Sequence, residues 1–365
     1  MRGGVMAQYE NNRSEVGTVY FVHKYLEKEW PDLIGNDNPG GSCDYIPRYK
    51  NGRDGWIITT YLELLNRGNA VRLSDNFIPG KVCVSHHDHI VGVPEAAKSY
   101  VVAIKADRAL TYTCENEIVQ SPTSLTNQRD YFIPYWPQSN IVPRDLSRGA
   151  LIENIVFMGR ERNLAIRFRE AAFQNELAKL GVKLHVVERS QWHDYKNADL
   201  VLAIRDGGDY YLASKPASKL VNAWIAGVPA ILGSEPAFNA LRRSELDFFP
   251  AQTEDDVLSI IKKLKECPEL YKDVIRNGSI RAEEFAFDAI CEQWERVLFD
   301  EITPNYIRWQ KGQQALWGCY PVIQYRLRTL YRTLFSRHYS RGYDRTGERL
   351  TLAYRLKKKF KSFRE

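Results

Sequence analysis

The 365-residue sequence contains no long apolar run, and this absence sets the first limits on its class. No stretch of about 18 uncharged apolar residues occurs, so a membrane-spanning helix is not expected. The polar start, Met1 to Arg13, has no signal-peptide core. The expected location is therefore cytoplasmic.

Cysteine is scarce and scattered along the chain. The six cysteines form no CxxC pair, so neither a zinc knuckle nor a disulfide framework is indicated, and we expect reduced thiols. No internal repeat with a period of about 20–50 residues is visible either. A solenoid or propeller is therefore not expected.

What is present is the composition of a folded protein. Apolar residues make up 44% of the chain and charged residues 26%, close to the values of soluble globular proteins. A chain of 365 residues exceeds what one hydrophobic core usually organises, so two domains of about 150 residues each are expected. Two domains also imply a cleft between them.

The net charge of +6 is concentrated at one end of the chain. Residues 325–365 hold thirteen Lys and Arg against three acidic residues, which leaves the rest of the chain at −4. The basic residues of this tail alternate with tyrosine, leucine and phenylalanine. The pattern indicates a local anionic partner, either a membrane surface or nucleic acid, with a solvated end as the alternative.

A strand–helix–strand rhythm in both halves predicts an α/β fold with doubly wound parallel sheets covered by helices. Strands are expected at 18–25, 70–73, 81–85, 155–158, 183–187, 200–204 and 230–232, and helices at 55–66, 164–180, 218–226, 255–265 and 268–294. The proline-rich stretch 134–149 is the expected connection. Domains over 1–150 and 151–300 are then followed by a helical, basic and aromatic extension over 301–365.

The segment from Ser214 to Pro229 is the strongest candidate for chemistry. It reads as a short helix that follows an apolar strand and ends at Gly227. At helical spacing one face is apolar, and the other carries four polar side chains, Lys215, Ser218, Lys219 and Asn222. Free N–H groups and the positive end of the dipole at a helix N-terminus favour an anion such as pyrophosphate. The alternative is a solvated face with two surface lysines.

A second phosphate-binding element is expected at Gly159-Arg160, where a predicted strand ends. The guanidinium of Arg160 can pair with phosphate, or it can cap the protein surface.

These elements resemble the donor half of GT-B glycosyltransferases, especially the large retaining family that uses nucleotide sugars. The resemblance rests on the run Ala226-Gly227-Val228-Pro229-Ala230-Ile231, the helix before it, and Gly159-Arg160 after a strand, and it covers about residues 150–300. It implies two Rossmann-like domains that face a cleft. It also implies a nucleotide-sugar site made of Gly159, Arg160, Lys215, Ser218, Lys219 and Asn222.

The sequence departs from that family at its Glu-x7-Glu motif, where Ser214 and Asn222 stand at the two glutamate positions. In the family the first glutamate contacts the sugar and the second binds the ribose, a contact that Asn222 can also make. Because of this departure, it stays open whether the family's catalytic mechanism and its retention of configuration apply to this sequence.

The densest titratable cluster is His86-His87-Asp88-His89, at the end of a predicted strand. Histidine and carboxylate can act as general base and orienting partner. In the resembling enzymes a histidine, often His-Asp, faces the donor sugar from this place, which favours His87 and Asp88 as the catalytic pair. Zinc at His87 and His89 lacks further ligands at suitable spacing, and histidines in a plain loop are the third interpretation.

The Gly40-Gly41 pair resembles the acceptor-side glycine loop of the same enzymes, with an ordinary turn as the alternative. No Asp-x-Asp motif stands at a strand end in suitable surroundings, which argues against the metal-dependent single-domain class. We therefore expect no metal, and no cofactor apart from a nucleoside diphosphate sugar as co-substrate.

The sequence thus predicts a metal-independent, hexosyltransferase-type glycosyltransferase. It would move a sugar from a nucleoside diphosphate sugar to a glycan or lipid-linked acceptor, in polysaccharide or glycolipid synthesis. Such an acceptor favours an anionic membrane surface over nucleic acid as the partner of the basic tail. The alternatives are a non-catalytic nucleotide- or glycan-binding partner of another transferase, and a sugar-nucleotide epimerase, which needs no acceptor.

Overall fold

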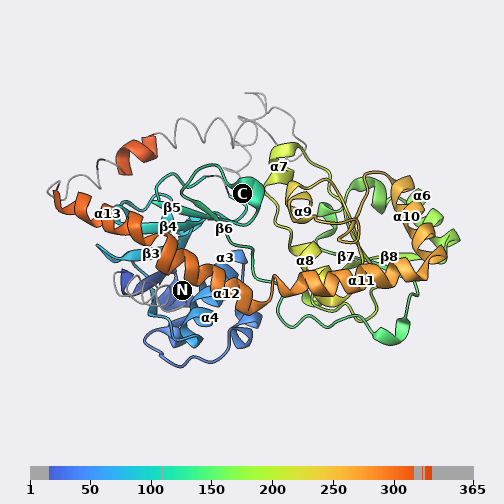
Figure 1. Ribbon diagram of the computed structural model, residues 1–365, viewed down its shortest axis with the longest axis horizontal. Coiled ribbons are helices and arrows are strands. Elements are labelled where there is room, and N and C mark those ends of the chain that lie inside the picture. The colour runs from blue at the N-terminus through green and yellow to red at the C-terminus, as the bar shows by residue number, and fades with distance from the viewer. Residues whose placement is uncertain (1–15, 109, 316–322, 324, 331–365) are drawn as a thin grey trace, which may run out of the picture.

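A computed structural model describes residues 16–108, 110–315, 323 and 325–330 and shows two α/β domains side by side (Figure 1). The first sheet has six parallel strands in the order β2-β1-β3-β4-β5-β6. Its strands are β1 (Val19–Val22), β2 (Val71–Ser74), β3 (Val82–His86), β4 (Tyr100–Ile104), β5 (Asn116–Val119) and β6 (Asp130–Phe132).

The second sheet has five parallel strands in the order β11-β10-β9-β7-β8. Its strands are β7 (Asn154–Met158), β8 (Lys183–Val187), β9 (Leu200–Ala203), β10 (Ala230–Leu232) and β11 (Phe249–Pro250). The predicted architecture of two doubly wound parallel sheets is therefore confirmed. Strands β4, β5 and β6 were not among the predicted strands.

Helices cover both sheets. The first domain contains α2 (Leu26–Glu29), α3 (Gly52–Asp54), α4 (Thr60–Asn66) and α5 (His87–Ile90), and a π-helical turn at Gly55–Thr59 joins α3 to α4. The second contains α6 (Ala171–Lys179), α7 (Asp209–Ala213), α8 (Ser218–Ala226), α9 (Pro236–Leu241), α10 (Glu254–Glu266) and α11 (Pro268–Glu283). Two further α-helices, α12 (Phe287–Arg296) and α13 (Thr303–Ala315), follow, and a π-helical turn at Val297–Glu301 lies between them.

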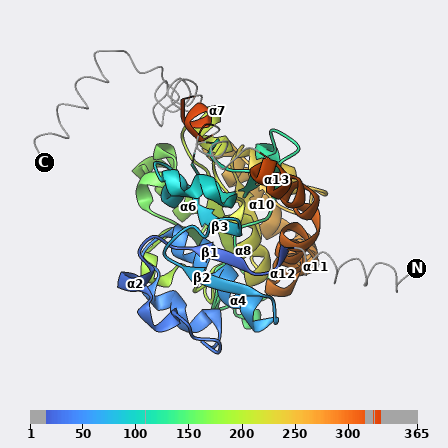
Figure 2. The same cartoon turned by 90° about the vertical axis from the view of Figure 1, so that its left-hand side faces the viewer.

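The chain returns to the first domain after the second is complete. Helix α11 runs along the second domain toward the first, and α12 and α13 continue across the first (Figure 1). Trp294 of α12 and Tyr306 of α13 are buried in the hydrophobic core of the first sheet. Figure 2 looks onto the first domain and shows α12 beside α4. These contacts tie the first domain to both ends of the second.

Two predicted helices are shorter in the structure. The helix expected over 164–180 begins only at Ala171, because the preceding backbone is bonded to the segment that follows β9: Ala165 N–H donates to Ile204 O, and Ile166 N–H donates to Asp206. The helix expected over 268–294 is broken after α11, where the buried Phe285 packs against Trp224 at 5.8 Å between ring centroids.

Direct contacts fix one domain against the other near the cleft. The side-chain amide of Gln120 donates to Ser214 O at 3.1 Å, and the backbone N–H of Gln138 donates to Asn222 Oδ1 at 3.1 Å. Lys215 Nζ lies 3.7 Å from an Asp107 carboxylate oxygen. The three contacts place the start of α8 opposite the strand ends of the first sheet.

Most of the basic tail lies outside the described residues. Within its described part, Arg328 donates to a carboxylate oxygen of Glu115 at 2.8 Å and to Cys114 O at 3.1 Å. No helix in the described ranges combines the length and the apolar character needed to cross a bilayer.

Candidate active site

A cleft of about 570 Å³ lies between the two domains, where strands of the first sheet end and α8 of the second domain begins. The first domain lines it with Asn51, Gly52 and Arg53 at the start of α3, with His86 and Asp88 after β3, with Asp107 and Arg108 after β4, and with Gln120 after β5. The second domain contributes Pro216 and Ser218 at the start of α8. Ligands of open α/β sheets bind at such carboxyl ends of parallel strands.

Helix α8 opens into this cleft, as its sequence predicts. It spans Ser218–Ala226 and ends at Gly227, whose φ of 68° is the left-handed conformation that glycine adopts most easily. Its apolar face, including Leu220 and Trp224, is buried on the second sheet. Ala217 at the N-cap position has no side-chain acceptor, so no N-cap side chain binds the first N–H groups of α8.

Lys219 lies in the first turn of α8 and lines a smaller cavity, of about 180 Å³, near the cleft. Its side chain packs over the Phe157 ring, with Nζ 5.5 Å from the ring centre. Burial lowers the pKa of Lys219 to about 7, and the neighbouring Arg205 adds to this shift, although Glu235 opposes it. Arg205 itself donates to Glu235 at 2.9 Å. An anion beside Lys219 would supply the negative charge that this ammonium group lacks.

Gly159 makes room for the Phe157 ring, over which Lys219 packs. A Cβ at Gly159 would lie 2.9 Å from the Phe157 ring and 3.5 Å from Cε of Lys219. The adjacent Arg160 is exposed and is not among the residues that line the cavities around α8. The structure thus brings Gly159 to the site through packing, and it leaves Arg160 at the surface.

Lys215 precedes Lys219 in the segment before α8, and Asn222 follows Lys219 within α8. Lys215 Nζ lies 4.2 Å from the centre of the Tyr211 ring and 3.7 Å from Asp107, so it contacts both domains. Asn222 accepts from Gln138 N–H and is hydrogen-bonded to Tyr195, which is 1% exposed. Asn222 therefore anchors the interdomain connection as well as lining a cavity.

His86, and not His87, is the histidine that lines the cleft. Strand β3 ends at His86, and α5 starts at His87 and turns that side chain inward, where its Nδ1 lies 3.1 Å from Thr111 Oγ1. The sequence left open which of these histidines faces the cleft, and His87, favoured there as the catalytic histidine, is not among the residues that line it. Asp88 N–H donates to His86 Nδ1 at 3.2 Å, so the ring proton of neutral His86 is placed on Nε2. Burial lowers the pKa of His86 to about 4, although Asp88 opposes the shift.

Asp88 lines the cleft, but its carboxylate is already paired. Arg108 donates to both of its oxygens, at 2.8 and 2.9 Å. These hydrogen bonds lower the pKa of Asp88 to about 2. A carboxylate held in this way orients its neighbours and is a poor proton acceptor at neutral pH.

Gly52 is the glycine among the residues that line the cleft, and the predicted pair Gly40-Gly41 is not among them. Gly40 accepts from the Asn66 side chain at the far end of α4, and both predicted glycines are exposed there. Gly52 lines the cleft, and a Cβ on Gly55 would lie 2.1 Å from the Tyr135 hydroxyl. A 3-10 helix over Ser42–Arg48 separates the pair from α3, and the acceptor-side role of Gly40-Gly41 stays a prediction.

Arg53 is a cleft cation that the sequence prediction missed. Its Nε donates to Asn51 Oδ1 at 2.9 Å, and its Nη1 lies 3.1 Å from His89 Nε2. The signal in the sequence was Asn51 followed three residues later by Asp54, which form a capping box at the start of α3. Arg108 and Gln120 were also missed, because β4 and β5 were not predicted.

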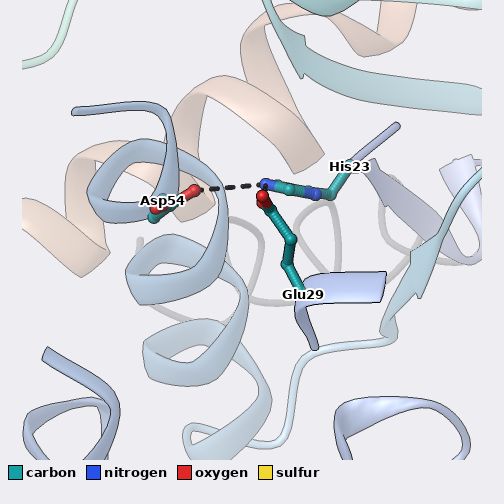
Figure 3. Close-up of side chains that lie close together, drawn as sticks. All are labelled: His23, Glu29 and Asp54. Atoms are coloured by element: carbon teal, nitrogen blue, oxygen red, sulfur yellow. Dashed lines mark hydrogen bonds and ion pairs between the residues drawn. The ribbon is translucent and has the colours of Figure 1, made fainter. Parts of the chain in front are cut away.

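A buried polar group of His23, Glu29 and Asp54 supports the start of α3 (Figure 3). Its ligand atoms lie within 4.8 Å of one another, which suits a metal ion. However, Tyr25 N–H donates to His23 Nδ1 at 3.3 Å, which places the ring proton on Nε2, 3.2 Å from an Asp54 oxygen. The lone pair that a metal would need is thus replaced by an N–H donor.

Asp54 fixes the backbone of the α3 start. Its Oδ2 accepts from the N–H of Lys50 at 2.8 Å and of Asn51 at 3.3 Å. Burial alone would raise the pKa of Asp54, but the hydrogen bonds from His23 and Lys50 outweigh it and lower the pKa. The group is therefore a hydrogen-bonded support for Arg53, which projects from the same turn.

No family model and no curated protein matches the sequence. Among solved structures the chain is similar to the GtfA/B complex, with 11% identity over 68% of this chain and 61% of that one and a TM-score of 0.42. It is similar to HepE from Anabaena in complex with UDP-glucose, with 11% identity over 77% and 99% of the two chains and a TM-score of 0.47.

A third similar structure is sucrose-phosphate synthase from Thermosynechococcus elongatus, with 12% identity over 81% and 92% of the two chains and a TM-score of 0.45. The chain spans 61% of the GtfA/B chain and 55% of TarM, less than two thirds of either length. The fold assignment rests on the strand orders of the two sheets.

Proposed function

We propose that the protein is a glycosyltransferase that takes a nucleoside diphosphate sugar as donor and passes the sugar to a glycan or lipid-linked acceptor. One observation carries this proposal. The uncapped start of α8, with Lys219 beside it, opens into the interdomain cleft opposite the wall that carries Arg53 and His86.

The diphosphate would lie at the start of α8. Free helix N–H groups, the positive end of the helix dipole and the ammonium groups of Lys215 and Lys219 all favour an anion there. Asn222 retains one N–H and one lone pair beyond its contacts with Gln138 and Tyr195, and these can bind ribose hydroxyls. Arg53 gives the opposite wall a further positive charge.

The sugar would lie between α8 and the end of β3. Neutral His86 would donate a hydrogen bond from Nε2 to a sugar oxygen, because its Nδ1 already accepts from Asp88 N–H. Asp88, paired with Arg108, would hold this part of the loop in place. The predicted pair His87 and Asp88 is thereby replaced by His86 as the sugar contact and Asp88 as a positioning residue.

In the transfer step the bond between the sugar C1 and the diphosphate oxygen breaks, and the diphosphate leaves with the electron pair. The acceptor hydroxyl forms the new bond to C1, and its proton passes to a phosphate oxygen of the leaving diphosphate or to solvent. Lys215, Lys219 and the start of α8 would stabilise the charge on the leaving group, a task that divalent metal ions perform in other enzymes. The account therefore proposes a metal-independent reaction.

Release of the nucleoside diphosphate tests this function. The purified protein is incubated with UDP-, GDP- and ADP-sugars, with and without glycan acceptors, and the released nucleotide is measured. We expect release from one donor class, faster with acceptor. Binding of a donor without release or transfer would contradict an enzyme and favour a non-catalytic partner of another transferase, and conversion of the sugar without an acceptor would favour an epimerase.

We also propose that the basic tail, residues 325–365, brings the enzyme to an anionic membrane surface. Thirteen basic residues, each contributing about 1 kcal/mol near such a surface, support reversible binding. Sedimentation with phosphatidylserine vesicles should carry down the full chain but not a variant that lacks 331–365. Equal sedimentation of both would contradict the proposal.

A further inference from the structure

An ion pair joins the two domains at the edge of the cleft, between Asp107 of the first domain and Lys215 of the second. Lys215 Nζ lies 3.7 Å from Asp107 Oδ2, and the Lys215 side chain is 16% exposed. Asp107 lines the cleft, whereas Lys215 is not among the residues that line the cleft or the smaller cavity along α8. One of the two lysines that the proposed function assigns to the diphosphate is thus turned toward a carboxylate of the protein itself.

The turn that follows β4 places Asp107 opposite the second domain. Arg108 N–H donates to Lys105 O at 3.1 Å, and Ala106, inside this turn, has a φ of 51°. Residues other than glycine adopt this left-handed conformation rarely, and those that do cluster at active sites and switch regions. Ala106 itself lines the cleft. The unfavourable backbone conformation therefore lies directly beside the carboxylate that meets Lys215.

The guanidinium of Arg108 fixes the Asp107 carboxylate independently of Lys215. Its Nη1 donates to Asp107 Oδ1 at 2.9 Å, while its Nε and Nη2 donate to the two oxygens of Asp88. The other oxygen of Asp107, Oδ2, is the one near Lys215. Because Arg108 holds the carboxylate, Asp107 stays in place when the ammonium group moves away, and the ion pair can form again.

Lys215 has a second anionic partner in the proposed function. It lies three residues before Ser218, the first residue of α8, where the diphosphate is proposed to bind. The backbone next to it is fixed, because the Gln120 side chain donates to Ser214 O at 3.1 Å. Its ammonium group, in contrast, is carried on a flexible four-carbon stem. A carboxylate of the protein and the diphosphate of the donor thus compete for one cation.

We propose that Asp107 is a built-in competitor of the donor, which holds Lys215 in the free protein and gives it up to the diphosphate when a donor binds. The inference rests on the proposed function, because it takes the diphosphate to lie at the start of α8. The competition lowers the affinity for the donor and for the nucleoside diphosphate that remains after transfer. The return of Lys215 to Asp107 assists the release of this product.

Asp107→Asn tests the competition, because the amide keeps the shape of the side chain and removes its charge. Exposed ion pairs contribute little, and the loss of this one corresponds to about two- to fivefold in affinity. Calorimetric titration should therefore show that inorganic diphosphate binds Asp107→Asn about two- to fivefold more tightly than the wild type. Asp75→Asn is the matched control, since it removes one negative charge after β2, outside the cleft lining, and it should bind like the wild type.

The same substitution in a Lys215→Met background shows whether the gain depends on the ion pair. Asp107→Asn should then bring no gain in the affinity for inorganic diphosphate. Unchanged or weaker binding in Asp107→Asn would overturn the competition, and so would an equal gain in Asp75→Asn or in the absence of Lys215. If neither the wild type nor Asp107→Asn binds inorganic diphosphate, UDP, GDP or ADP, the proposed function fails, and the inference fails with it.

Discussion

The backbone N–H of Asp88 donates to Nδ1 of His86 at 3.2 Å, and this contact decides what the histidine can do. With Nδ1 occupied, the ring proton is on Nε2. With its pKa lowered to about 4 by burial, His86 stays neutral at physiological pH. It is therefore a hydrogen-bond donor to the cleft.

The first prediction concerns His86 and His87. His86→Ala should lower the rate of nucleotide release from the donor roughly tenfold, as expected for one lost hydrogen bond, with unchanged affinity for the nucleoside diphosphate. His87→Asn is the control, because the His87 ring contacts Thr111 and is not among the residues that line the cleft. The rate of nucleotide release by His87→Asn should stay near that of the wild type. A larger loss in His87→Asn than in His86→Ala would restore the pair that the sequence predicts.

The second prediction is the pH dependence of nucleotide binding. The pKa of Lys219 is lowered to about 7, so its ammonium form is lost as pH rises above that value. If the charged form binds the diphosphate, affinity should fall by up to about tenfold per pH unit between about pH 7.5 and 9. Titration calorimetry over this range measures the slope.

Lys219→Arg is the control for that slope. Arginine keeps its charge over the whole range, so its affinity should be nearly independent of pH. The same decline in wild type and in Lys219→Arg would show that another group is responsible.

The third prediction concerns Gly159. Gly159→Ala would bring a methyl group to 2.9 Å from the Phe157 ring, so the ring must move, and Lys219, which packs over that ring, would shift with it. We expect a several-fold weaker nucleotide affinity, about 1 kcal/mol. Gly312→Ala on α13, where a Cβ meets open space, is the matched control and should bind like wild type. Equal nucleotide affinity in Gly159→Ala and Gly312→Ala would show that Gly159 does not contribute to the site.

The fourth prediction concerns the buried support beneath Arg53 (Figure 3). Asp54→Asn weakens a charge-assisted acceptor for Lys50 N–H, Asn51 N–H and His23. The free energy of unfolding should fall by about 1–3 kcal/mol, measured by urea denaturation. Because the group is hydrogen-bonded and not metal-bound, EDTA should leave the wild-type Tm unchanged. A fall in Tm with EDTA, reversed by zinc, would identify a metal site instead.

Local signals in the sequence were sufficient for α8. Its predicted range, 218–226, matches the structure because Gly227 and Pro229 end the helix by local chemistry alone. The strands β7 to β10 were also found, since each is a short apolar run between turns. The part of the chain that carries Lys219 could therefore be placed from sequence.

The first-domain half of the site could not be placed in the same way. Every residue of β3 is buried, so the strand has no alternation of buried and exposed side chains that could indicate which histidine faces the cleft. The end of the strand at His86 and the helical turn from His87 depend on tertiary contacts such as the one with Thr111.

The most direct test of the account is the thermal stabilisation of the purified protein by UDP, GDP, ADP and their sugars, compared between wild type and Lys219→Ala. Binding to the native state at 100 times Kd stabilises by about 2.7 kcal/mol, which raises Tm measurably. The account predicts a shift in Tm with one nucleotide class that disappears in Lys219→Ala. No shift with any of them, or an equal shift in both proteins, would contradict a nucleotide-sugar site at the start of α8.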